Sequence, residues 1–361
     1  MKRLTVFLLA VLLLTQPVRA SAELPAADAM ILLHGPSGRV LAGKNADARL
    51  PMASTTKIMT ALLALECCAM DEEVEIRPEW TRVEGSSMYL RGGDICTVGD
   101  LIHGLMLSSG NDAALALADI CAGDMESFVA LMNRRAAELG LTNTHFMNPH
   151  GLPAEGHYSS AADMARLMAA AMENEIFRAV TASRTYQWGE HSYRNHNKLL
   201  WRCEGCTGGK TGYTRAAGRC LVSSCRRDGM ELVCVTLNCR GDWEAHASLY
   251  DWAFAEYTGY TLESGTLIAS VPVVGAAQEC ADAVAAGELR LCLDKGSKVQ
   301  LTADLPRFVY APLKKEECGR LYVWLEGQKI AEIPLCWAQE VPFYETAEIS
   351  FRGGALLPPG G

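Results

Sequence analysis

A serine and a lysine, Ser54 and Lys57, stand three residues apart at the start of an apolar stretch, PMASTTKIMTALLALE. The apolar residues of this stretch recur with helical spacing, and residues three apart on a helix share one face within contact distance. A serine hydroxyl is a weak nucleophile that needs a base. A lysine can be that base where burial or a neighbouring cation disfavours its ammonium form. The pair therefore predicts nucleophilic catalysis at the beginning of a helix, whose positive end would stabilise oxyanion charge.

Two other short motifs, Ser109-Gly110-Asn111 and Lys210-Thr211-Gly212, lie further along the chain. Each motif alone is weak: a serine and a lysine can simply cap a helix and meet solvent, and Ser-Gly-Asn suits a turn. The three motifs in this order and at this spacing are a more specific signal than any one of them alone. Their expected positions, at a helix start, in a loop between two helices and on a strand, make the combination more specific still.

The three motifs resemble the serine–lysine, Ser-x-Asn and Lys-Thr-Gly set of class A β-lactamases and penicillin-binding proteins. Longer stretches resemble one branch of the latter, the low-molecular-mass serine-type D-alanyl-D-alanine carboxypeptidases (peptidase S11). These stretches are PMASTTKIMTALLALE, EGSSMYLRGGD, LMLSSGNDAALALA, NPHGLP with HYSSAADMA, and GGKTGYTRAAGRCLVSS. The resemblance covers about residues 26 to 261, and the segment that follows resembles that family's C-terminal domain.

The resemblance implies a role for each residue of the acylation step. Ser54 would be the nucleophile and Lys57 its base, facing Lys210. Two backbone N–H groups, those of Ser54 and Tyr213, would form the oxyanion hole.

The resemblance also assigns the residues that would hold the substrate. Ser109 would relay a proton to the leaving amine, and Asn111 would bond both the peptide and the lysine base. Lys210 and Thr211 would hold the carboxylate of the terminal D-alanine. The strand through Gly212 would pair with the peptide backbone.

The implied substrates are peptidoglycan stem peptides that end in D-Ala-D-Ala, with β-lactams as inhibitors and no cofactor. A metal is not expected either, because Cys203 and Cys206 form one Cys-x-x-Cys pair and no second pair with suitable spacing follows. His150 and His157 suggest a Ser-His triad as an alternative. A structural role is preferred, because the lysine already supplies the base and no orienting acid is identified.

Two alternative functions share parts of this pattern. A class A β-lactamase uses the same acylation groups but adds a glutamate within Glu-x-x-Leu-Asn, and no such stretch occurs between Asn111 and Lys210. A non-catalytic penicillin-recognising sensor would join a membrane segment to a signalling region. Neither follows here, and the complete motifs argue against an inactive enzyme.

The first 22 residues are predicted to be a secretory signal peptide. They combine a basic start, the apolar run LTVFLLAVLLL and the small residues Ala20-Ser21-Ala22. The chain is therefore expected on the extracytoplasmic face of a bacterial envelope. The formal charge is −9 (33 basic and 42 acidic residues); without three basic residues of the signal it becomes 30 − 42 = −12. An acidic chain is a poor nucleic-acid binder.

The 14 cysteines do not resemble the framework of a small disulfide-rich domain. Cys225 and Cys234 flank a turn at Asp228-Gly229, which places them diagonally on one sheet face, a long spacing for a disulfide. Many cysteines are expected to be small buried hydrophobic residues.

Residues 23–261 are predicted to form an α+β domain with the penicillin-binding, transpeptidase-like fold, an antiparallel sheet flanked by helices. Its N-terminal hairpin is expected to pair with the late strands, after which residues 262–350 read as short strands of a small all-β sandwich. Residues 351–361 are expected to be a flexible tail. Many family members end in a membrane-lying amphipathic helix, whereas this tail shows no helical apolar stripe, so contact with a membrane surface stays open.

Overall fold

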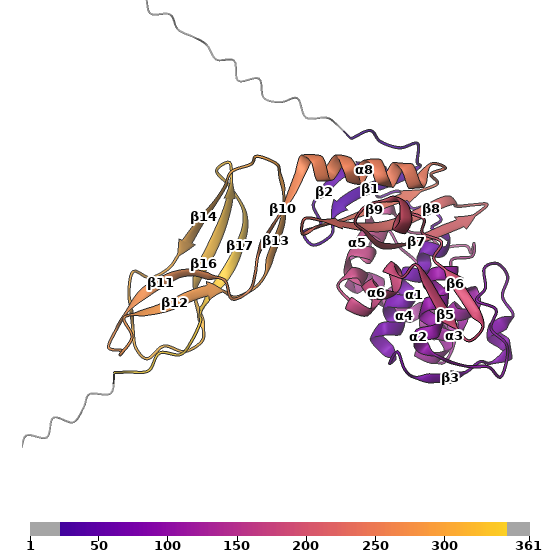
Figure 1. The fold of residues 1–361 in the computed structure, drawn as a ribbon, viewed down its shortest axis with the longest axis horizontal. Coiled ribbons are helices and arrows are strands. Elements are labelled where there is room, and N and C mark those ends of the chain that lie inside the picture. Colours follow the sequence, from indigo (N-terminus) through magenta and orange to yellow (C-terminus); the bar gives the residue numbers. More distant parts are fainter. Residues whose placement is uncertain (1–21, 345–361) are drawn as a thin grey trace, which may run out of the picture. The chain divides into compact units, whose positions relative to one another are not determined.

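The structure is a computed structural model that describes residues 22–344. The predicted signal peptide, apart from Ala22, and the predicted tail lie outside the described residues. The chain divides between Thr258 and Gly259 into two compact units, each of which is described by itself (Figure 1).

A five-stranded antiparallel sheet forms the centre of the first unit, in the order β2-β1-β9-β8-β7. The N-terminal hairpin pairs with a late strand, as Ile31 opposite Val235 shows. This confirms the predicted link between the two ends of the domain. The strands of the sheet are β1 (Ala29–His34), β2 (Val40–Lys44), β7 (Cys206–Thr214), β8 (Gly218–Arg227) and β9 (Met230–Leu237).

Eight α-helices and three other helical turns occur among the described residues. The α-helices are α1 (Lys57–Cys67), α2 (Val98–His103), α3 (Asn111–Ala122), α4 (Met125–Glu138), α5 (Ala161–Met172), α6 (Glu175–Ala182), α7 (Leu199–Arg202) and α8 (Asp242–Glu256). The other turns are the 3-10 turns η1 (Ala53–Thr56) and η2 (Pro78–Thr81) and the π-helical turn η3 (Gly104–Ser108).

The sheet has one face covered by α8 and the other by the remaining helices, with α5 directly against it (Figure 1). Successive side chains of β8 point alternately toward the helical layer and toward α8. Val222 belongs to the large apolar core shared with the helices, whereas Ser223 contacts His246 and Tyr250 of α8. Burial lowers the pKa of His246 to about 3, so this imidazole is neutral and bridges Ser223 and Thr236 by hydrogen bonds.

Helix α1 is the central element of the helical layer. Every residue from Lys57 to Ala64 is buried, and the helix packs against α3, α5, α6 and η3. An amphipathic helix would expose one side. Because α1 is enclosed on all sides, the polar Lys57 at its start is held inside the protein.

The second unit consists of strands, and the predicted fold class is confirmed. A six-stranded sheet has the order β14-β16-β17-β12-β11-β15, and a second sheet joins β10 to β13. The division at residues 258 and 259 falls within β10, slightly before the boundary expected at 261. The strands are β10 (Tyr257–Leu262), β11 (Leu267–Val274), β12 (Cys280–Ala285), β13 (Leu289–Asp294), β14 (Val299–Asp304), β15 (Val309–Tyr310), β16 (Glu317–Leu325) and β17 (Gln328–Trp337).

Two antiparallel ribbons in the first unit had no sequence signal strong enough to predict them. They pair β3 (Glu73–Glu75) with β4 (Ile95–Thr97) and β5 (Thr185–Trp188) with β6 (His191–Arg194). Both are short, with three or four residues in each strand, and carry many polar side chains. The second ribbon ends beside the cleft described below.

All 14 cysteines are free thiols in the structure. The registers of β8 and β9 place Cys225 opposite Leu232 and Cys234 opposite Ser223, which confirms the predicted diagonal placement. No described helix is both long and apolar enough to cross a membrane.

Candidate active site

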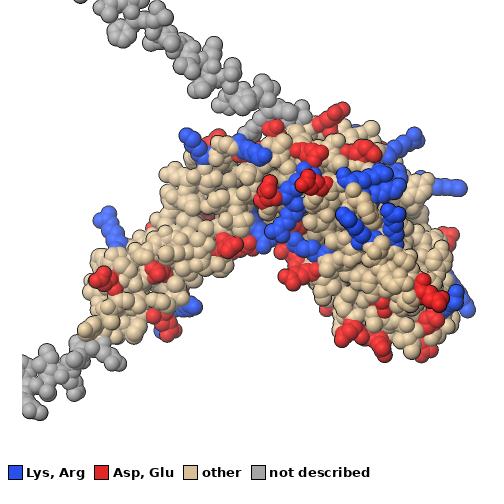
Figure 2. Space-filling model, viewed as in Figure 1, with Lys and Arg blue, Asp and Glu red and all other residues tan. Residues whose placement is uncertain are grey.

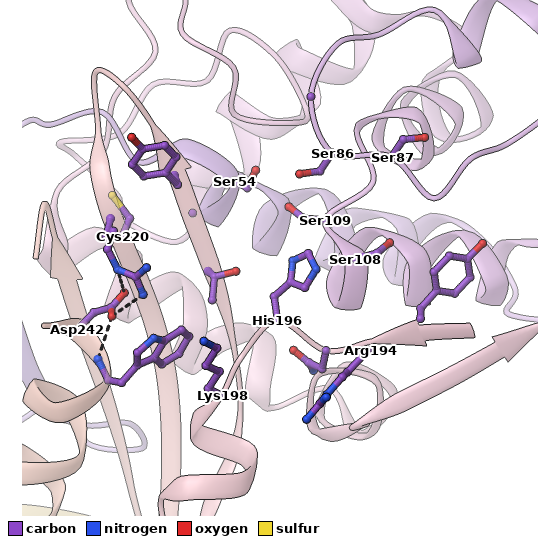
Figure 3. Close-up of a pocket in the computed structure, with 18 of the residues that line it drawn as sticks. Ser54, Ser86, Ser87, Ser108, Ser109, Arg194, His196, Lys198, Cys220 and Asp242 are labelled. Atoms are coloured by element: carbon purple, nitrogen blue, oxygen red, sulfur yellow. Dashed lines mark hydrogen bonds and ion pairs between the residues drawn. The ribbon is translucent and has the colours of Figure 1, made fainter. Parts of the chain in front are cut away.

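A cleft of about 1120 Å³ lies along the outer edge of β7 and brings the three motifs together. Its lining includes Ser54, Ser109 and Thr211, one residue from each motif. Figure 3 shows the hydroxyls of Ser54, Ser86 and Ser109 converging from different elements. Residues more than 150 positions apart in the sequence thus line the same cleft.

Ser54 lies in the 3-10 turn η1, not in the first turn of α1 as the sequence predicted. The preceding Ala53 has a φ of +50°, a left-handed conformation that is unfavourable for a residue with a Cβ. Thr55 and Thr56 tighten the turn by donating hydroxyl hydrogen bonds to the carbonyls of Met52 and Ala53 (2.7 and 2.8 Å). The hydroxyls thus stabilise a local structure that competes with a regular helix.

Lys57 reaches three acceptors from the base of the cleft. Its Nζ donates to Ser54 Oγ (3.1 Å), Asn111 Oδ1 (2.6 Å) and the His150 carbonyl (2.7 Å). Burial is the main cause that holds the pKa of Lys57 well below its usual value; the positive charge of Lys210 lowers it further and Asp112 opposes the shift. The sequence prediction that burial and a second lysine would favour the neutral amine therefore agrees with the structure.

The segment around Ser109 has an irregular backbone that the sequence did not reveal. The π-helical turn η3 ends at Ser109, whose φ is +65°, and α3 begins two residues later at Asn111. Asn111 Oδ1 faces Lys57, while its Nδ2 donates to the Glu84 carbonyl (2.6 Å). The amide is oriented by these two partners, so its oxygen is the atom presented to the lysine.

Lys210 approaches the same region from β7. Its Nζ donates to Ser109 Oγ and to the Thr211 carbonyl, both at 3.0 Å. Burial lowers the pKa of Lys210 to about 7. Ser109 therefore lies in contact with one lysine, and Asn111, two residues on, with the other.

The edge of β7 is open to a substrate because β8 pairs with only one of its sides. Gly212 packs directly on η1, since a Cβ at this position would lie 3.0 Å from both the Met52 carbonyl and the Ser54 nitrogen. This close approach puts the N–H of Ser54 beside the strand that continues to Tyr213. The Tyr213 side chain is exposed and borders the cleft.

A loop over the cleft depends on Asp112, a residue that the sequence analysis did not select. The buried carboxylate accepts from the Ser87 hydroxyl (2.5 Å) and from the N–H groups of Met88 and Leu90 (3.0 and 3.2 Å). The adjacent Asn111 N–H donates to the Ser86 carbonyl (2.8 Å). Only its position after Ser-Gly-Asn could have drawn attention to Asp112.

The two histidines have partners that suit structural roles. His157 Nδ1 accepts from the Met147 N–H (3.0 Å), and its Nε2 contacts Thr56 Oγ1 (2.9 Å). His150 Nδ1 accepts from the Leu152 N–H (3.2 Å). Burial lowers the pKa of His150 to about 3 and that of His157 to about 4. His150 contributes through its backbone carbonyl, a contact that residue type alone could not predict.

A single acidic side chain, Asp242, occurs among the described residues that line the cleft. Its two oxygens accept from the Arg219 guanidinium at 2.8 and 3.2 Å. A carboxylate engaged in a bidentate pair is poorly placed to act as a base on water. In the described residues, no group of three or more His, Cys, Asp or Glu residues could hold a metal ion.

The sequence and fold match known proteins over most of the chain. Residues 16–241 match the model of the D-alanyl-D-alanine carboxypeptidase family, peptidase S11. The chain belongs to this family. Bacillus subtilis D-alanyl-D-alanine carboxypeptidase DacF is 32% identical over 94% of this chain and 95% of its own length. Escherichia coli DacA, also named a D-alanyl-D-alanine carboxypeptidase, is 34% identical over 88% of this chain and 84% of its own length.

A solved structure shows the same architecture. Penicillin-binding protein 5 from Haemophilus influenzae superposes with a TM-score of 0.76, 29% sequence identity, and coverage of 90% of this chain and 99% of that one. The resemblance to the carboxypeptidase family predicted from the motifs is therefore confirmed, including the β-rich C-terminal part.

The position of Ser54, the predicted nucleophile of this carboxypeptidase, depends on Gly151. Its φ is +89°, and an added Cβ would lie 2.0 Å from the Ala53 carbonyl oxygen and 2.9 Å from the Ser54 nitrogen. We expect Gly151→Ala to displace η1 and slow the acylation of Ser54 by penicillin about 10²-fold, as a shift of about 1 Å can do. Stopped-flow acylation kinetics would measure this effect.

Gly156→Ala is a matched control for that substitution. Gly156 has a similar φ of +81°, but its added Cβ would meet nothing closer than 3.6 Å. Both variants carry the backbone strain of alanine at positive φ, and only the first presses on η1. Equal acylation rates in the two variants would contradict the proposed contact.

Proposed function

We propose that this carboxypeptidase removes the terminal D-alanine from peptidoglycan stem peptides through an acyl-enzyme on Ser54. The observation that carries the proposal is the contact of Lys57 Nζ with Ser54 Oγ (3.1 Å) inside a buried, three-partner arrangement. The relatives named D-alanyl-D-alanine carboxypeptidases support the choice of substrate.

Lys57 would act as the base in its neutral form. A neutral amine has two N–H groups and one lone pair. The N–H groups can keep their bonds to Asn111 Oδ1 and the His150 carbonyl, which leaves the lone pair for the Ser54 hydroxyl. As Ser54 Oγ attacks the peptide carbonyl carbon, its proton passes to Lys57.

The oxyanion formed in this attack would be stabilised by the backbone N–H groups of Ser54 and Tyr213. The close packing of Gly212 on η1 supports this role, because it brings the strand bearing Tyr213 against Ser54. Fixed donors of this type stabilise charge that develops in the transition state without reorganising. The exposed edge of β7 would meanwhile pair with the peptide backbone.

The leaving amine needs a proton, and we infer that Ser109 would deliver it. Its hydroxyl accepts from Lys210 (3.0 Å), and Asn111, two residues on, accepts from Lys57. The proton taken from Ser54 would pass from Lys57 through Ser109 to the nitrogen of the departing D-alanine. The C–N bond then breaks, D-alanine leaves, and water hydrolyses the Ser54 ester.

The terminal carboxylate of the substrate would meet Lys210 and Thr211. Lys210 is buried in the cleft wall, where an anion would favour its ammonium form. Thr211 lines the cleft beside it. This pairing would require a free C-terminus, which is the property that defines a carboxypeptidase.

The two alternatives have less support. The cleft-lining acid Asp242 is paired with Arg219, so the described site lacks the free carboxylate of a class A β-lactamase. A non-catalytic sensor would not need the neutral-amine arrangement around Lys57. Export through the predicted signal peptide 1–22 is part of the proposal, because the proposed substrate, peptidoglycan, lies outside the cytoplasmic membrane.

We expect penicillin to label Ser54 alone. Ser54→Ala should fold normally and take up no adduct by intact-protein mass spectrometry, because the attacking oxygen is gone. Lys57→Ala should acylate about 10²–10⁴-fold more slowly, the usual contribution of a base. If the Ser54→Ala protein were labelled, the nucleophile would be another residue. If Lys57→Ala were acylated at a near-normal rate, the base would be another residue.

The charge of Lys210 should set the alkaline side of the pH profile. Its pKa is about 7 in the free enzyme, and kcat/KM reports the free enzyme. As pH rises through that pKa, the ammonium is lost, so kcat/KM for a free-acid D-Ala-D-Ala peptide should fall. A C-terminal amide analogue should show no such fall.

Lys210→Arg tests the same assignment, because arginine keeps its charge throughout the accessible pH range. Its residual activity on the free-acid peptide should lack the alkaline fall. In addition, Lys210→Ala should reduce cleavage of the free-acid peptide more than that of the amide. Equal losses on the two peptides would show that Lys210 acts in another way, for example by lowering the pKa of Lys57.

Deacylation should distinguish this enzyme from a β-lactamase. D-alanine departs after acylation and leaves room for water beside the ester, whereas the opened penicillin ring stays attached and obstructs that space. A peptidyl adduct should therefore turn over quickly, and the penicilloyl adduct should persist far longer. Side-by-side kinetics of D-alanine release and penicillin hydrolysis would measure this, and faster penicillin hydrolysis would overturn the carboxypeptidase assignment.

A further inference from the structure

Three cations form one rim of the active-site cleft and have no role in the chemistry described above. Arg194 lies at the end of β6, Lys198 precedes α7, and Arg202 ends α7. All three side chains are exposed and line the same cleft as Ser54. These three residues are called the basic rim below.

The basic rim is not neutralised by acidic side chains. Within residues 22–344, many other arginines form ion pairs, among them Arg178 with Glu231 and Arg219 with Asp242. No described ion pair involves the basic rim. The rim is thus a local group of positive charges on a chain whose formal charge is −9. Figure 2 shows basic side chains crowded over the part of the first unit that carries β7 and β8.

An aromatic side chain, Trp201, holds one member of the basic rim. The Arg194 guanidinium lies 4.9 Å from the ring centre of Trp201, and that of Arg184 lies 5.8 Å from it. Arg184 is itself fixed by a bond to the Leu200 carbonyl (2.7 Å). Stacking on a π face holds a guanidinium without neutralising its charge. Arg194 is thus positioned for an anion that arrives from solvent.

The rim lies on the side of the cleft where the substrate carboxylate is proposed to bind. Figure 3 shows His196 between Ser109 and Lys198, and Ser109 in turn accepts a hydrogen bond from Lys210. Burial and the charge of Lys210 lower the pKa of His196, which leaves this imidazole neutral. Apart from Arg219, which is paired with Asp242, the described lysines and arginines that line the cleft are those of the basic rim.

We propose that the basic rim is an anion-capture subsite that attracts the C-terminal carboxylate of the incoming peptide before it settles against Lys210 and Thr211. This inference rests on the proposed function. Lys210 is buried and holds a fraction of its charge near neutral pH, whereas exposed arginine and lysine side chains remain charged. A cleft lined by charges of one sign raises the local concentration of an oppositely charged substrate. The carboxylate of a β-lactam would be attracted in the same way.

The test compares two triple variants with the same change of charge. One removes the rim (Arg194→Gln, Lys198→Gln and Arg202→Gln). The control changes Arg134, Arg226 and Arg240 to Gln; these are exposed residues of the first unit that do not line this cleft. Turnover of a D-Ala-D-Ala peptide would be measured with the full chain at an ionic strength of about 20 mM and about 500 mM, because salt screens exposed charges.

We expect the rim variant to lose about tenfold in kcat/KM at low ionic strength, the range that electrostatic attraction by a few charges produces. Its kcat should stay within about twofold of the unchanged chain, since the rim does not touch the reacting atoms. The deficit should nearly vanish at high salt. The control variant should match the unchanged protein at both ionic strengths.

Several results would overturn the proposal. A loss that is the same at both ionic strengths, a loss in kcat instead of kcat/KM, or an equal loss in the control would exclude capture by the rim. Reduced binding of the rim variant to purified cell-wall sacculi, with unchanged peptide kinetics, would assign the rim to wall-polymer docking instead. If the unchanged protein released no D-alanine, the proposed function itself would be wrong. If only the proposal for the basic rim were wrong, the unchanged protein would still release D-alanine, and its kcat/KM would not depend on salt.

Discussion

The burial of Lys57 is the constraint on which the rest of the active site depends. An ammonium group removed from water is costly unless it is paired, and here the direct partners are a serine hydroxyl, an amide oxygen and a backbone carbonyl, not a carboxylate. The cost is reduced when the amine is neutral, and the neutral amine is the form that can accept a proton. The enclosure of α1 by helices on all sides therefore has a chemical consequence. Packing that places Lys57 inside the core also lowers its pKa, as the proposed base role requires.

That arrangement requires backbone geometry that regular elements cannot supply. Ala53 and Ser109 both have positive φ values, and each stands immediately beside or within a motif that presents a side chain to the cleft. Strained residues of this kind persist where the surrounding structure fixes them. Here the close packing of Gly151 and Gly212 against η1 provides the fixing contacts. The order of the catalytic groups thus depends on small residues that perform no chemistry.

Much of the fold, and the three motifs that meet at the cleft, could be predicted from the sequence, because motif spacing and apolar periodicity are local properties. The alternation along β8 and β9 correctly placed Cys225 and Cys234 on a diagonal. Other features depend on contacts that have no local signal. The threonine hydroxyls convert the expected first turn of α1 into η1, and Asp112 orders a loop more than 20 residues earlier in the chain. The His150 carbonyl could not be predicted from residue type, because every residue has one.

The distribution of charge around the cleft connects substrate choice with the fate of the acyl-enzyme. The exposed cations of the basic rim line the cleft, while its one described acidic side chain, Asp242, is engaged by Arg219. A site built in this way favours anions, and both a peptide C-terminus and a β-lactam carboxylate are anions. The same absence of a free carboxylate among the described cleft residues leaves water without a dedicated base. Under the proposed mechanism, hydrolysis would then depend on the leaving group vacating its place and on Lys57, the proposed base of acylation. On that proposal, a substrate whose leaving group departs would be processed, whereas one whose leaving group stays attached would remain bound to Ser54. A cleft that attracts anions would therefore admit the inhibitor as well as the substrate.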